Sequence, residues 1–283
     1  MRKFAGRLAT LAVAATAVVA GSVAAPAAAH ESEPLDYVAL GDSYTAGIGA
    51  GIVERSELYK DMECYQAKPP GYVDVLDGRP DVELAVNAAC AGWTAAAVPV
   101  QVGVASAAGL NAGTDLVTIT AGGNDVGFQR ILEACLVPKS LEVCETEVEK
   151  GEATARTQVF PALSNAYASI RATAPNATIV ALGYPHLFSP EFGDQPYITD
   201  EAAELFNKGT DTLNEVIEKA AKQVRGTVYA DVTDEFEGHG IGSPASWIHL
   251  PGSAAGFHPT ETGYAKGYYR AVVREAGIWA LRH

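Results

Sequence analysis

Basic residues are scarce in this sequence. Only 20 Lys and Arg stand against 34 Asp and Glu, which gives a formal net charge of -14. Proteins that bind nucleic-acid phosphates or anionic lipid surfaces use basic patches, so this charge argues against both kinds of partner. Long apolar runs are also rare, and the one that is long enough to interact with a membrane core lies at the N-terminus. For the rest of the chain we expect no stable membrane insertion.

The N-terminal run has the three-part pattern of a secretory signal peptide. Three basic side chains stand among the first seven residues, an Ala- and Val-rich stretch follows, and Ala27-Ala28-Ala29 closes it. A membrane anchor is the alternative, but the alanine content and the cleavage-type site disfavour it. We predict a signal peptide over 1–29 and a single extracellular domain over 30–283. Loss of the three positive charges would take the formal net charge from -14 to -17.

Cysteine is rare too, with only 4 in the chain. An even number in an exported chain argues for two disulfides, for which three pairings are possible. We favour Cys64 with Cys90 and Cys135 with Cys144, because the second pair closes a short loop. The spacings lack the close cysteine pair of a zinc site, and the six histidines show no ligand spacing. We therefore predict neither a metal nor an organic cofactor.

The chain is organised around residues 37–47. An apolar run there ends abruptly in Gly41-Asp42-Ser43, which predicts a buried strand that stops at a tight turn with a hydroxyl at its tip. Ser43 is the candidate nucleophile. A serine hydroxyl attacks poorly alone, so the rest of the chain must supply a base and donors for an oxyanion.

Further strands and helices alternate along the chain. This alternation predicts a mostly parallel sheet of five strands, in the order 2-1-3-4-5, with helices on both faces. The other strands are expected at 82–86, 115–120, 178–182 and 227–231, and helical spacing of apolar residues is seen over 159–170, 213–224 and 261–276. In the last helix, Thr260 is the expected cap and Gly277 the expected end.

Three loops follow the predicted strand ends with residues that suit a catalytic site. Gly92 would lie where a strand gives way to a helix capped by Thr94, and Asn124 follows two glycines; each alone could be an ordinary turn. Ligands of open parallel sheets bind beyond the carboxyl ends of the strands. The long loop 232–259 also ends there, and we favour its His258 as the base over His239 and His249, because a capped helix follows directly.

Two segments have no decisive pattern. Residues 126–150 are expected to be a loop, a flap beside the site that the Cys135–Cys144 bond would staple. The segment 184–197 is rich in Pro, Phe and Tyr, and it could either wall an apolar substrate groove or place its aromatic rings in the core. The sequence leaves these two alternatives open.

Four motifs in this order resemble the SGNH hydrolases, also called GDSL lipases or esterases, and most closely their secreted actinomycete branch. The motifs are Gly41-Asp42-Ser43, Gly92, Gly122-Gly123-Asn124-Asp125 and His258-Pro259. The resemblance implies an α/β fold, a flavodoxin-like three-layer α/β/α sandwich, and it supports the two local disulfides. Some relatives carry a third disulfide that this chain lacks.

The resemblance also implies roles for the motif residues. Ser43 would attack an ester carbonyl, and His258 would take its proton. The oxyanion would be bound by the backbone N–H groups of Ser43 and Gly92 and by the side-chain amide of Asn124. We expect a monomer that acts on a small-molecule or lipid ester.

One position departs from the family pattern. The family usually has an aspartate three residues before the histidine, where this chain has Ala255. We predict a Ser43–His258 dyad in which a backbone carbonyl, most simply that of Ala255, orients the ring. The alternative is a carboxylate from elsewhere, and the nearest in sequence are Asp231, Asp234 and Glu235.

The expected function is that of a secreted lipase or carboxylesterase, an ester hydrolase that cleaves fatty-acyl esters. A phospholipase A-type activity or deacetylation of a polysaccharide could use the same groups. A binding protein that has kept the fold and lost the chemistry is the alternative outside the enzymes, and the joint presence of Ser43, Gly92, Asn124 and His258 argues against it.

Overall fold

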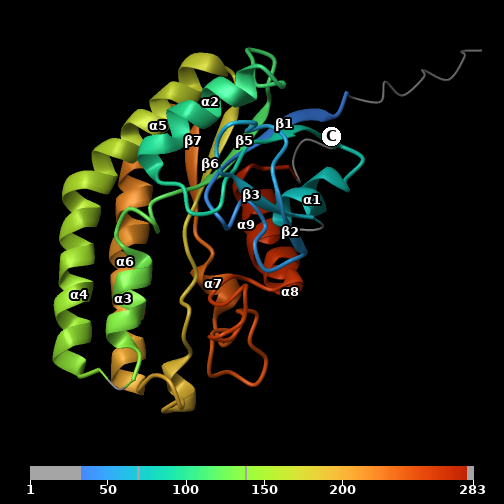
Figure 1. Ribbon diagram of the computed structural model, residues 1–283. Helices are drawn as coiled ribbons and strands as arrows, with labels where there is room; N and C mark the ends of the chain where they lie inside the picture. The colour runs from blue at the N-terminus through green and yellow to red at the C-terminus, as the bar shows by residue number, and fades with distance from the viewer. Residues whose placement is uncertain (1–32, 69–70, 138, 279–283) are drawn as a thin grey trace, which may run out of the picture. The chain divides into compact units, whose positions relative to one another are not determined.

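A computed structural model describes residues 33–68, 71–137 and 139–278, and at its centre is a sheet of five parallel strands (Figure 1). The strands are β1 (Leu35–Gly41), β4 (Val82–Asn87), β5 (Leu116–Thr120), β6 (Thr178–Leu182) and β7 (Thr227–Ala230). Their order is β4-β1-β5-β6-β7, and all neighbours pair in parallel. The predicted sheet and strand order are confirmed, whereas the predicted signal peptide lies outside the described residues.

The central strands are buried on both faces, which explains their continuous apolar sequences. β5 is buried along its whole length, and the last five residues of β1 are buried as well. β1 pairs with β5 from Tyr37–Leu116 to Gly41–Thr120, so both strands end at the same edge. The loops that follow them therefore start side by side.

Helices cover both faces of this sheet, as Figure 1 shows. α2 (Val98–Ser106), α5 (Phe160–Thr173) and α6 (Asp200–Ala221) pack together on one face. α1 (Tyr72–Asp77) and α9 (Tyr269–Glu275) contact each other on the opposite face. The result is the expected three-layer α/β/α sandwich. No helix in the described ranges has the length and apolar character needed to cross a membrane.

The last helix begins and ends as the sequence predicts. It consists of α8 (Glu261–Gly263), a π-helical turn η4 (Tyr264–Tyr268) and α9. The Thr260 hydroxyl accepts a hydrogen bond from the Gly263 N–H at 3.2 Å, so Thr260 is the cap. Gly277 has a φ of 65°, a left-handed conformation that ends helices and suits glycine.

The prediction of a loop over residues 126–150 is wrong. The chain there forms α3 (Phe128–Cys135) and α4 (Leu141–Thr154), and the Cys135–Cys144 disulfide joins the two helices. The buried face of α4 is narrow, with only Cys144, Val148 and Gly151 buried. Because glutamates separate these residues, the helical spacing is masked in the sequence.

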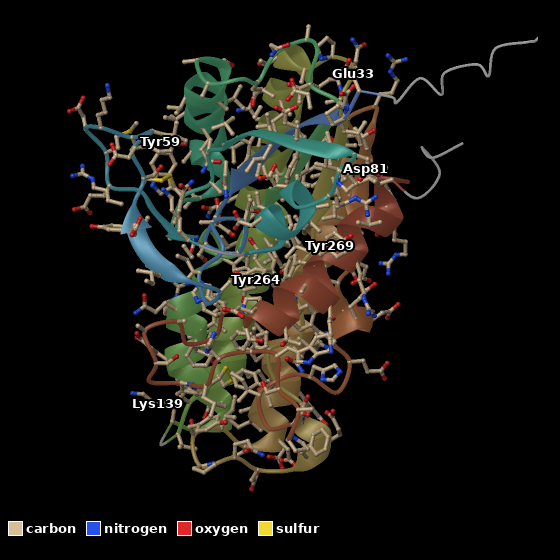
Figure 2. All side chains as sticks on the ribbon, turned by 90° about the vertical axis from the view of Figure 1, so that its right-hand side faces the viewer. Glu33, Tyr59, Asp81, Lys139, Tyr264 and Tyr269 are labelled. Atoms are coloured by element: carbon tan, nitrogen blue, oxygen red, sulfur yellow. A yellow bond between two sulfur atoms is a disulfide. The ribbon has the colours of Figure 1, made fainter. Side chains whose placement is uncertain are left out.

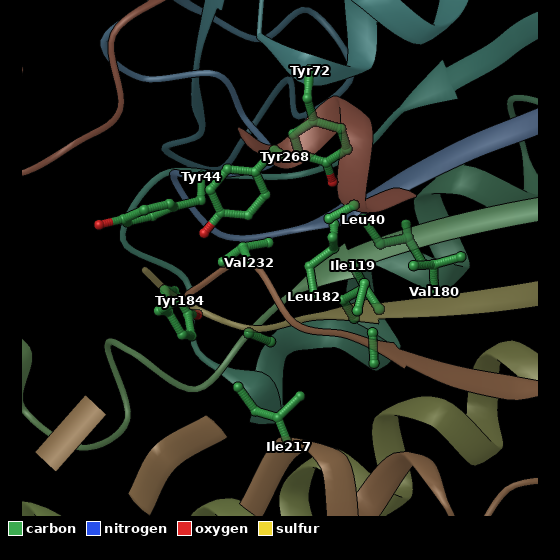
Figure 3. Close-up of a cluster of buried hydrophobic side chains, with 14 of the residues drawn as sticks. Leu40, Tyr44, Tyr72, Ile119, Val180, Leu182, Tyr184, Ile217, Val232 and Tyr268 are labelled. Carbon is green, nitrogen blue, oxygen red and sulfur yellow. The ribbon is translucent and has the colours of Figure 1, made fainter. Parts of the chain in front are cut away.

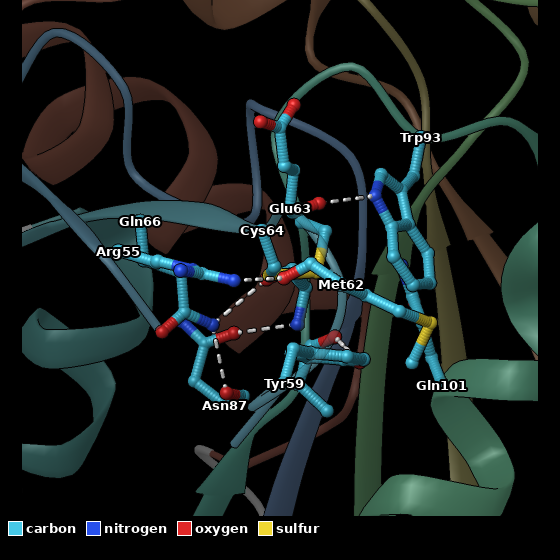
Figure 4. The surroundings of a disulfide bond; sticks show 12 residues. Arg55, Tyr59, Met62, Glu63, Cys64, Gln66, Asn87, Trp93 and Gln101 are labelled. Carbon is cyan, nitrogen blue, oxygen red and sulfur yellow. Dashed lines mark hydrogen bonds between the residues drawn. A yellow bond between two sulfur atoms is a disulfide. The ribbon is translucent and has the colours of Figure 1, made fainter. Parts of the chain in front are cut away.

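A small antiparallel ribbon, β2 (Ile52–Arg55) with β3 (Tyr65–Lys68), was not predicted. Figure 2 shows the segment around Tyr59, between these strands, at one side of the molecule. The Cys64–Cys90 disulfide ties this segment to the loop after β4, and the Gln66 amide donates to the carbonyls of Asn87, at the end of β4, and Ala89 in that loop (Figure 4). Both disulfide pairings favoured by the sequence are thus present. The remaining short elements are η1 (Ala95–Ala97), η2 (Ala155–Val159), η3 (Pro190–Phe192) and α7 (Thr233–Phe236).

Candidate active site

The loops beyond the carboxyl ends of the strands meet at one cavity of about 810 Å³. Ser43 follows β1, Gly92 follows β4 and Asn124 follows β5, and all three line this cavity together with His258. The four residues singled out from the sequence are therefore together at one edge of the sheet. This is where open parallel sheets bind ligands.

The turn that carries Ser43 depends on Gly41. Its φ is 126°, and a Cβ atom at this position would lie 2.2 Å from the Thr120 carbonyl oxygen. The Gln101 side chain holds the turn, since its amide group bonds both the N–H and the carbonyl of Gly41 at 2.8 Å. These contacts fix the backbone just ahead of Ser43.

The Ser43 hydroxyl lies in hydrogen-bond contact with His258. Its Oγ is 2.8 Å from Nε2 of the ring, while Nδ1 lies 3.1 Å from the Gly256 carbonyl oxygen. A carbonyl can only accept a hydrogen bond, so Nδ1 carries the proton in this contact. Nε2 is then free to accept the Ser43 proton, which is the tautomer that a general base needs.

The orienting carbonyl belongs to Gly256, and the prediction of Ala255 is wrong. The Ala255 carbonyl instead accepts the backbone N–H of His258 at 3.1 Å in a tight turn. Phe257, inside this turn, has a φ of 69° and is the only non-glycine residue with a positive φ in the described ranges. This left-handed conformation turns the Gly256 carbonyl toward the ring.

The carboxylates weighed as alternatives are engaged elsewhere. Asp231 accepts hydrogen bonds from the N–H and hydroxyl of Thr233, and Glu235 pairs with Arg274. Within the described ranges, no carboxylate, Asp234 included, hydrogen-bonds to the His258 ring. The geometry is that of a serine–histidine dyad.

Burial sets the protonation of His258. It lowers the pKa of the ring below the ordinary 6.5, because the imidazolium loses hydration, and the nearby His249 adds to this effect. The carbonyls of Gly256 and Ala255 oppose the shift. At neutral pH the ring is therefore neutral and able to accept a proton.

Two hydrogen bonds join the loop that contains Gly92 to the loop that contains Asn124. The Asn124 amide donates to the Trp93 carbonyl at 2.9 Å, and the Asp125 carboxylate accepts from the Ala95 N–H at 2.9 Å. Asp125 therefore caps the helix that starts at Ala95. Thr94, the predicted cap, makes no such bond. Because Asn124 Nδ2 carries two hydrogens, one remains for a ligand.

Asp42 holds the loops around the cavity in place by hydrogen bonds. Its carboxylate accepts hydrogen bonds from the Tyr184 and Thr120 hydroxyls and from the Tyr44 N–H. Burial raises the pKa of Asp42 to about 6, against the effect of these hydrogen bonds. The Tyr184 hydroxyl in turn accepts from the Gly123 N–H at 3.1 Å, which links the nucleophile turn to the Asn124 loop.

Tyr44 links the nucleophile turn to the histidine loop. Its hydroxyl donates to the Phe257 carbonyl at 2.8 Å, and its ring centre lies 5.3 Å from that of His258. The same ring packs edge-on against Tyr184 and beside Tyr268 (Figure 3). Tyr44 therefore holds both the strained turn at Phe257 and the imidazole face.

The other two histidines of the long loop serve different contacts. The His239 ring stacks on Trp247 with ring centres 3.7 Å apart. The His249 ring bonds the Gly49 carbonyl at 2.7 Å. Neither contacts Ser43, so the choice of His258 agrees with the geometry.

The cavity beyond the dyad is mostly apolar. α3, α4 and α6 contribute Phe128, Ile131, Leu132, Val148, Phe206 and Leu213 to its wall. From the aromatic segment 184–197, Tyr184 and Leu187 line the cavity, whereas Phe188 is buried in the core. Both alternatives for that segment are therefore partly correct.

Four residues of the site were not recognised from the sequence. Asp42 and Asp125 stand directly beside predicted site residues, and Tyr184 follows the end of β6 at the same edge of the sheet. A search for polar residues at every strand end could have found them. Tyr44 gave no signal, because its partner, Phe257, is more than two hundred residues away.

One group of carboxylates could hold a cation, at a place outside the cavity. Ligand oxygens of Asp194, Asp200 and Glu201 all lie within 4.8 Å of one another near the start of α6. Exposed carboxylates of this kind often gather at helix N-termini, where the dipole stabilises them. Within the described ranges, no other such group of three was found.

Comparison with known proteins gives this arrangement its context. The model of the GDSL-like lipase/acylhydrolase family matches residues 39–266, which include Ser43, Gly92, Asn124 and His258. The chain belongs to this family. Like other members, it is a carboxylic ester hydrolase, and its relatives by sequence carry the name lipase.

Two relatives and two solved structures span nearly all of the family domain. A lipase of Streptomyces rimosus is 31% identical over 86% of this chain and 88% of its own, and Lipase 1 of Streptomyces coelicolor is 31% identical over 95% and 97%. The structure of an extracellular S. rimosus lipase has a TM-score of 0.74 at 30% identity, covering 85% of this chain and 99% of the other. A phospholipase A1 of Streptomyces albidoflavus NA297 has a TM-score of 0.74 at 31% identity, covering 86% and 99%.

Proposed function

We propose that this family member is a secreted lipase that cleaves fatty-acyl esters through an acyl-enzyme on Ser43, with His258 as the general base. The observation that carries the proposal is the 2.8 Å contact between Ser43 Oγ and His258 Nε2 at the wall of an apolar cavity. A nucleophile within reach of a correctly oriented base is the arrangement that acyl transfer needs.

The first half of the reaction forms the acyl-enzyme. Ser43 Oγ attacks the ester carbonyl carbon while His258 Nε2 takes the hydroxyl proton. The carbonyl oxygen becomes an oxyanion, which accepts hydrogen bonds from the Ser43 and Gly92 N–H groups and from the Asn124 amide. When the tetrahedral intermediate collapses, the carbon–oxygen bond to the alcohol breaks, and His258 Nε2 gives its proton to the departing alkoxide.

The second half repeats these steps with water. His258 takes a proton from the water, the resulting hydroxide attacks the acyl carbonyl, and Ser43 leaves with the proton that His258 returns. Each fixed oxyanion donor lowers the barrier by about 3 kcal/mol, because the negative charge exists only in the intermediate and its transition states. The Gly256 carbonyl stabilises the imidazolium less than a carboxylate would, so these donors carry a larger share of the catalysis.

The acyl chain would lie between α3, α4 and α6. The apolar cavity opens from Ser43 toward these helices, and its volume of about 810 Å³ is near the upper end of the usual range for ligand pockets. Burial of each methylene group contributes about 0.8 kcal/mol. We therefore infer a preference for long acyl chains over acetate, which also sets this reaction apart from polysaccharide deacetylation.

A serine-directed fluorophosphonate tests the proposal. It should label the peptide that contains Ser43, Ser43→Ala should abolish the label, and His258→Gln should slow labelling by about a thousandfold. His239→Gln is the matched control, since that ring stacks on Trp247 away from the cavity, and it should label at the wild-type rate. A label on another residue, or one that persists in Ser43→Ala, would reject the assignment.

A phospholipase A activity is the second candidate. One observation favours it: the protein from S. albidoflavus NA297, to which this chain is 31% identical over most of both chains, is a phospholipase A1. Release of fatty acid from phosphatidylcholine, compared with release from a triacylglycerol at equal acyl length, separates the two activities.

Export and monomeric state complete the proposal. The S. rimosus structure is described as an extracellular lipase, which supports a signal peptide over 1–29 in this chain. N-terminal sequencing of protein from the culture medium should then give His30 as the first residue. We also infer that the protein works as a monomer without nucleic-acid partners, and sedimentation velocity checks the first of these points.

A further inference from the structure

Tyr184 lies between two of the loops that would supply oxyanion donors. It follows the end of β6, and its side chain lines the cavity. Its hydroxyl donates to Oδ2 of Asp42, in the turn that carries Ser43. The same hydroxyl accepts the Gly123 N–H at 3.1 Å, directly before Asn124. One buried hydroxyl group is therefore bonded to both loops.

Pairing within the sheet does not fix the distance between these two loops. β1 and β5 pair as far as Gly41 and Thr120, and one further bond joins the Asp42 N–H to the Thr120 carbonyl at 2.9 Å. Asn124 lies four residues beyond that bond. Its side-chain amide is tied to the loop after β4, so a link to the nucleophile turn has to come from another group.

Asn214 on α6 holds Tyr184 in this place. Its side-chain amide accepts the Tyr184 N–H and donates to the Tyr184 carbonyl, both at 2.8 Å. The residue before Tyr184 has to be small, because a Cβ atom on Gly183 would lie 2.9 Å from the Asn214 side-chain oxygen. Asn214 is itself buried, so its two bonds to Tyr184 do not compete with water. The Tyr184 backbone is therefore fixed from α6, independently of the two loops that its hydroxyl joins.

We propose that Tyr184 is a positioning residue of the oxyanion site, whose hydroxyl sets the distance between the Ser43 N–H and the Asn124 amide so that both reach the same oxygen. This inference rests on the proposed function, because it requires an oxyanion. Donors stabilise the intermediate only when they lie about 2.7–3.1 Å from that oxygen, so a small shift of the Asn124 loop removes most of its contribution. A phenylalanine in place of Tyr184 could bond neither loop.

A double-mutant cycle tests the proposal, with steady-state hydrolysis of a soluble short-chain chromogenic ester as the assay. Tyr184→Phe should lower kcat about thirtyfold and leave KM within twofold of wild type, because the displaced donor acts on the intermediate. Asn124→Ala should lower kcat about a hundredfold. If Tyr184 acts through Asn124, adding Tyr184→Phe to Asn124→Ala should lower kcat less than threefold further.

Tyr37→Phe is the matched control. Tyr37 is fully buried, its hydroxyl bonds the Thr118 hydroxyl at 2.7 Å inside the sheet, and it does not line the cavity. Both tyrosine variants should unfold at a lower urea concentration than wild type, because each loses a buried hydrogen bond. Only Tyr184→Phe should lose kcat, and Tyr37→Phe should stay within twofold of wild type.

Three outcomes would overturn the positioning role. An equal loss from Tyr184→Phe in the wild-type and Asn124→Ala backgrounds would show that the hydroxyl does not act through the amide. A wild-type kcat in Tyr184→Phe, or the same loss in Tyr37→Phe, would assign the hydroxyl to stability alone. If Tyr184→Phe does not fold, Asn214→Ala, which keeps the hydroxyl and frees its backbone, takes its place in the same cycle with the same expected coupling to Asn124.

The proposed function fails separately. If wild-type protein hydrolyses the soluble ester but no long-chain ester, the lipase assignment is wrong, while the cycle still decides the role of Tyr184. If long-chain esters are hydrolysed through Ser43 and the cycle is additive, the function stands and the positioning role is rejected.

Discussion

The Tyr44→Phe substitution tests how His258 is held without a carboxylate. It removes one hydroxyl and leaves the ring that packs against His258 and Tyr184. The lost hydrogen bond is the one that the hydroxyl donates to the Phe257 carbonyl at 2.8 Å. That carbonyl belongs to the strained turn that aims the Gly256 carbonyl at the imidazole.

The size of the effect follows from two contributions. A left-handed conformation at a bulky residue such as Phe257 costs about 1–2 kcal/mol, so the turn needs its restraints. Loss of one partner of a part-buried hydrogen bond costs about 1–3 kcal/mol. If this loss makes a displaced position of His258 more stable than the reactive one by about 1.4 kcal/mol, only about a tenth of the molecules keep the reactive geometry. We therefore expect kcat to fall about tenfold, with KM within twofold of wild type.

The assay is steady-state hydrolysis of a chromogenic long-chain ester, together with urea unfolding. Tyr59→Phe is the matched control, because the Tyr59 hydroxyl is also buried and donates to a single backbone carbonyl, that of Ala88, at 2.6 Å. Both variants should lose about 1–2 kcal/mol of unfolding free energy. A wild-type kcat for Tyr44→Phe, or the same loss of kcat in Tyr59→Phe, would refute the role assigned to Tyr44.

Three further predictions concern pH, the cavity and the ribbon. Because burial lowers the pKa of His258 and only the neutral ring accepts a proton, kcat/KM should fall on the acid side with a midpoint below 6.5; a midpoint above it would exclude this base. Thr210→Phe should lower kcat/KM for long-chain esters about tenfold and spare short-chain esters, since Thr210 lines the cavity from α6. Replacing Cys64 and Cys90 by serine should cost about 3.5 kcal/mol by urea unfolding, about 1 kcal/mol more than loss of the other disulfide, because the first bond spans 26 residues and the second 9; equal losses would contradict this.

The sequence was enough for the sheet but not for the elements around the cavity. β6 was predicted at its observed bounds because its apolar run is short and flanked by polar turns. α4 was missed because only three of its 14 residues are buried and charged residues separate them, and its stability depends on packing against α3 and α6. The β2–β3 ribbon was missed because β2 is exposed along its whole length and the ribbon is held to the distant loop after β4 by the Cys64–Cys90 disulfide.

In the site, too, some features follow from local motifs and others depend on tertiary contacts. That Ser43, Gly92, Asn124 and His258 lie at one cavity could be predicted because each stands in a recognisable motif at the end of a strand or the start of a helix. The group that orients His258 could not, since the choice between the Ala255 and Gly256 carbonyls depends on the φ of a single residue, Phe257. Backbone conformation at that resolution is decided by tertiary contacts.

Trapping the covalent intermediate would show whether Ser43 is the nucleophile. Wild-type protein mixed with a long-chain chromogenic ester and quenched in acid within milliseconds should yield one peptide whose mass has risen by the acyl group, and fragmentation should place that group on Ser43. An acyl group on another residue, or rapid turnover in which Ser43 never carries one, would contradict the account.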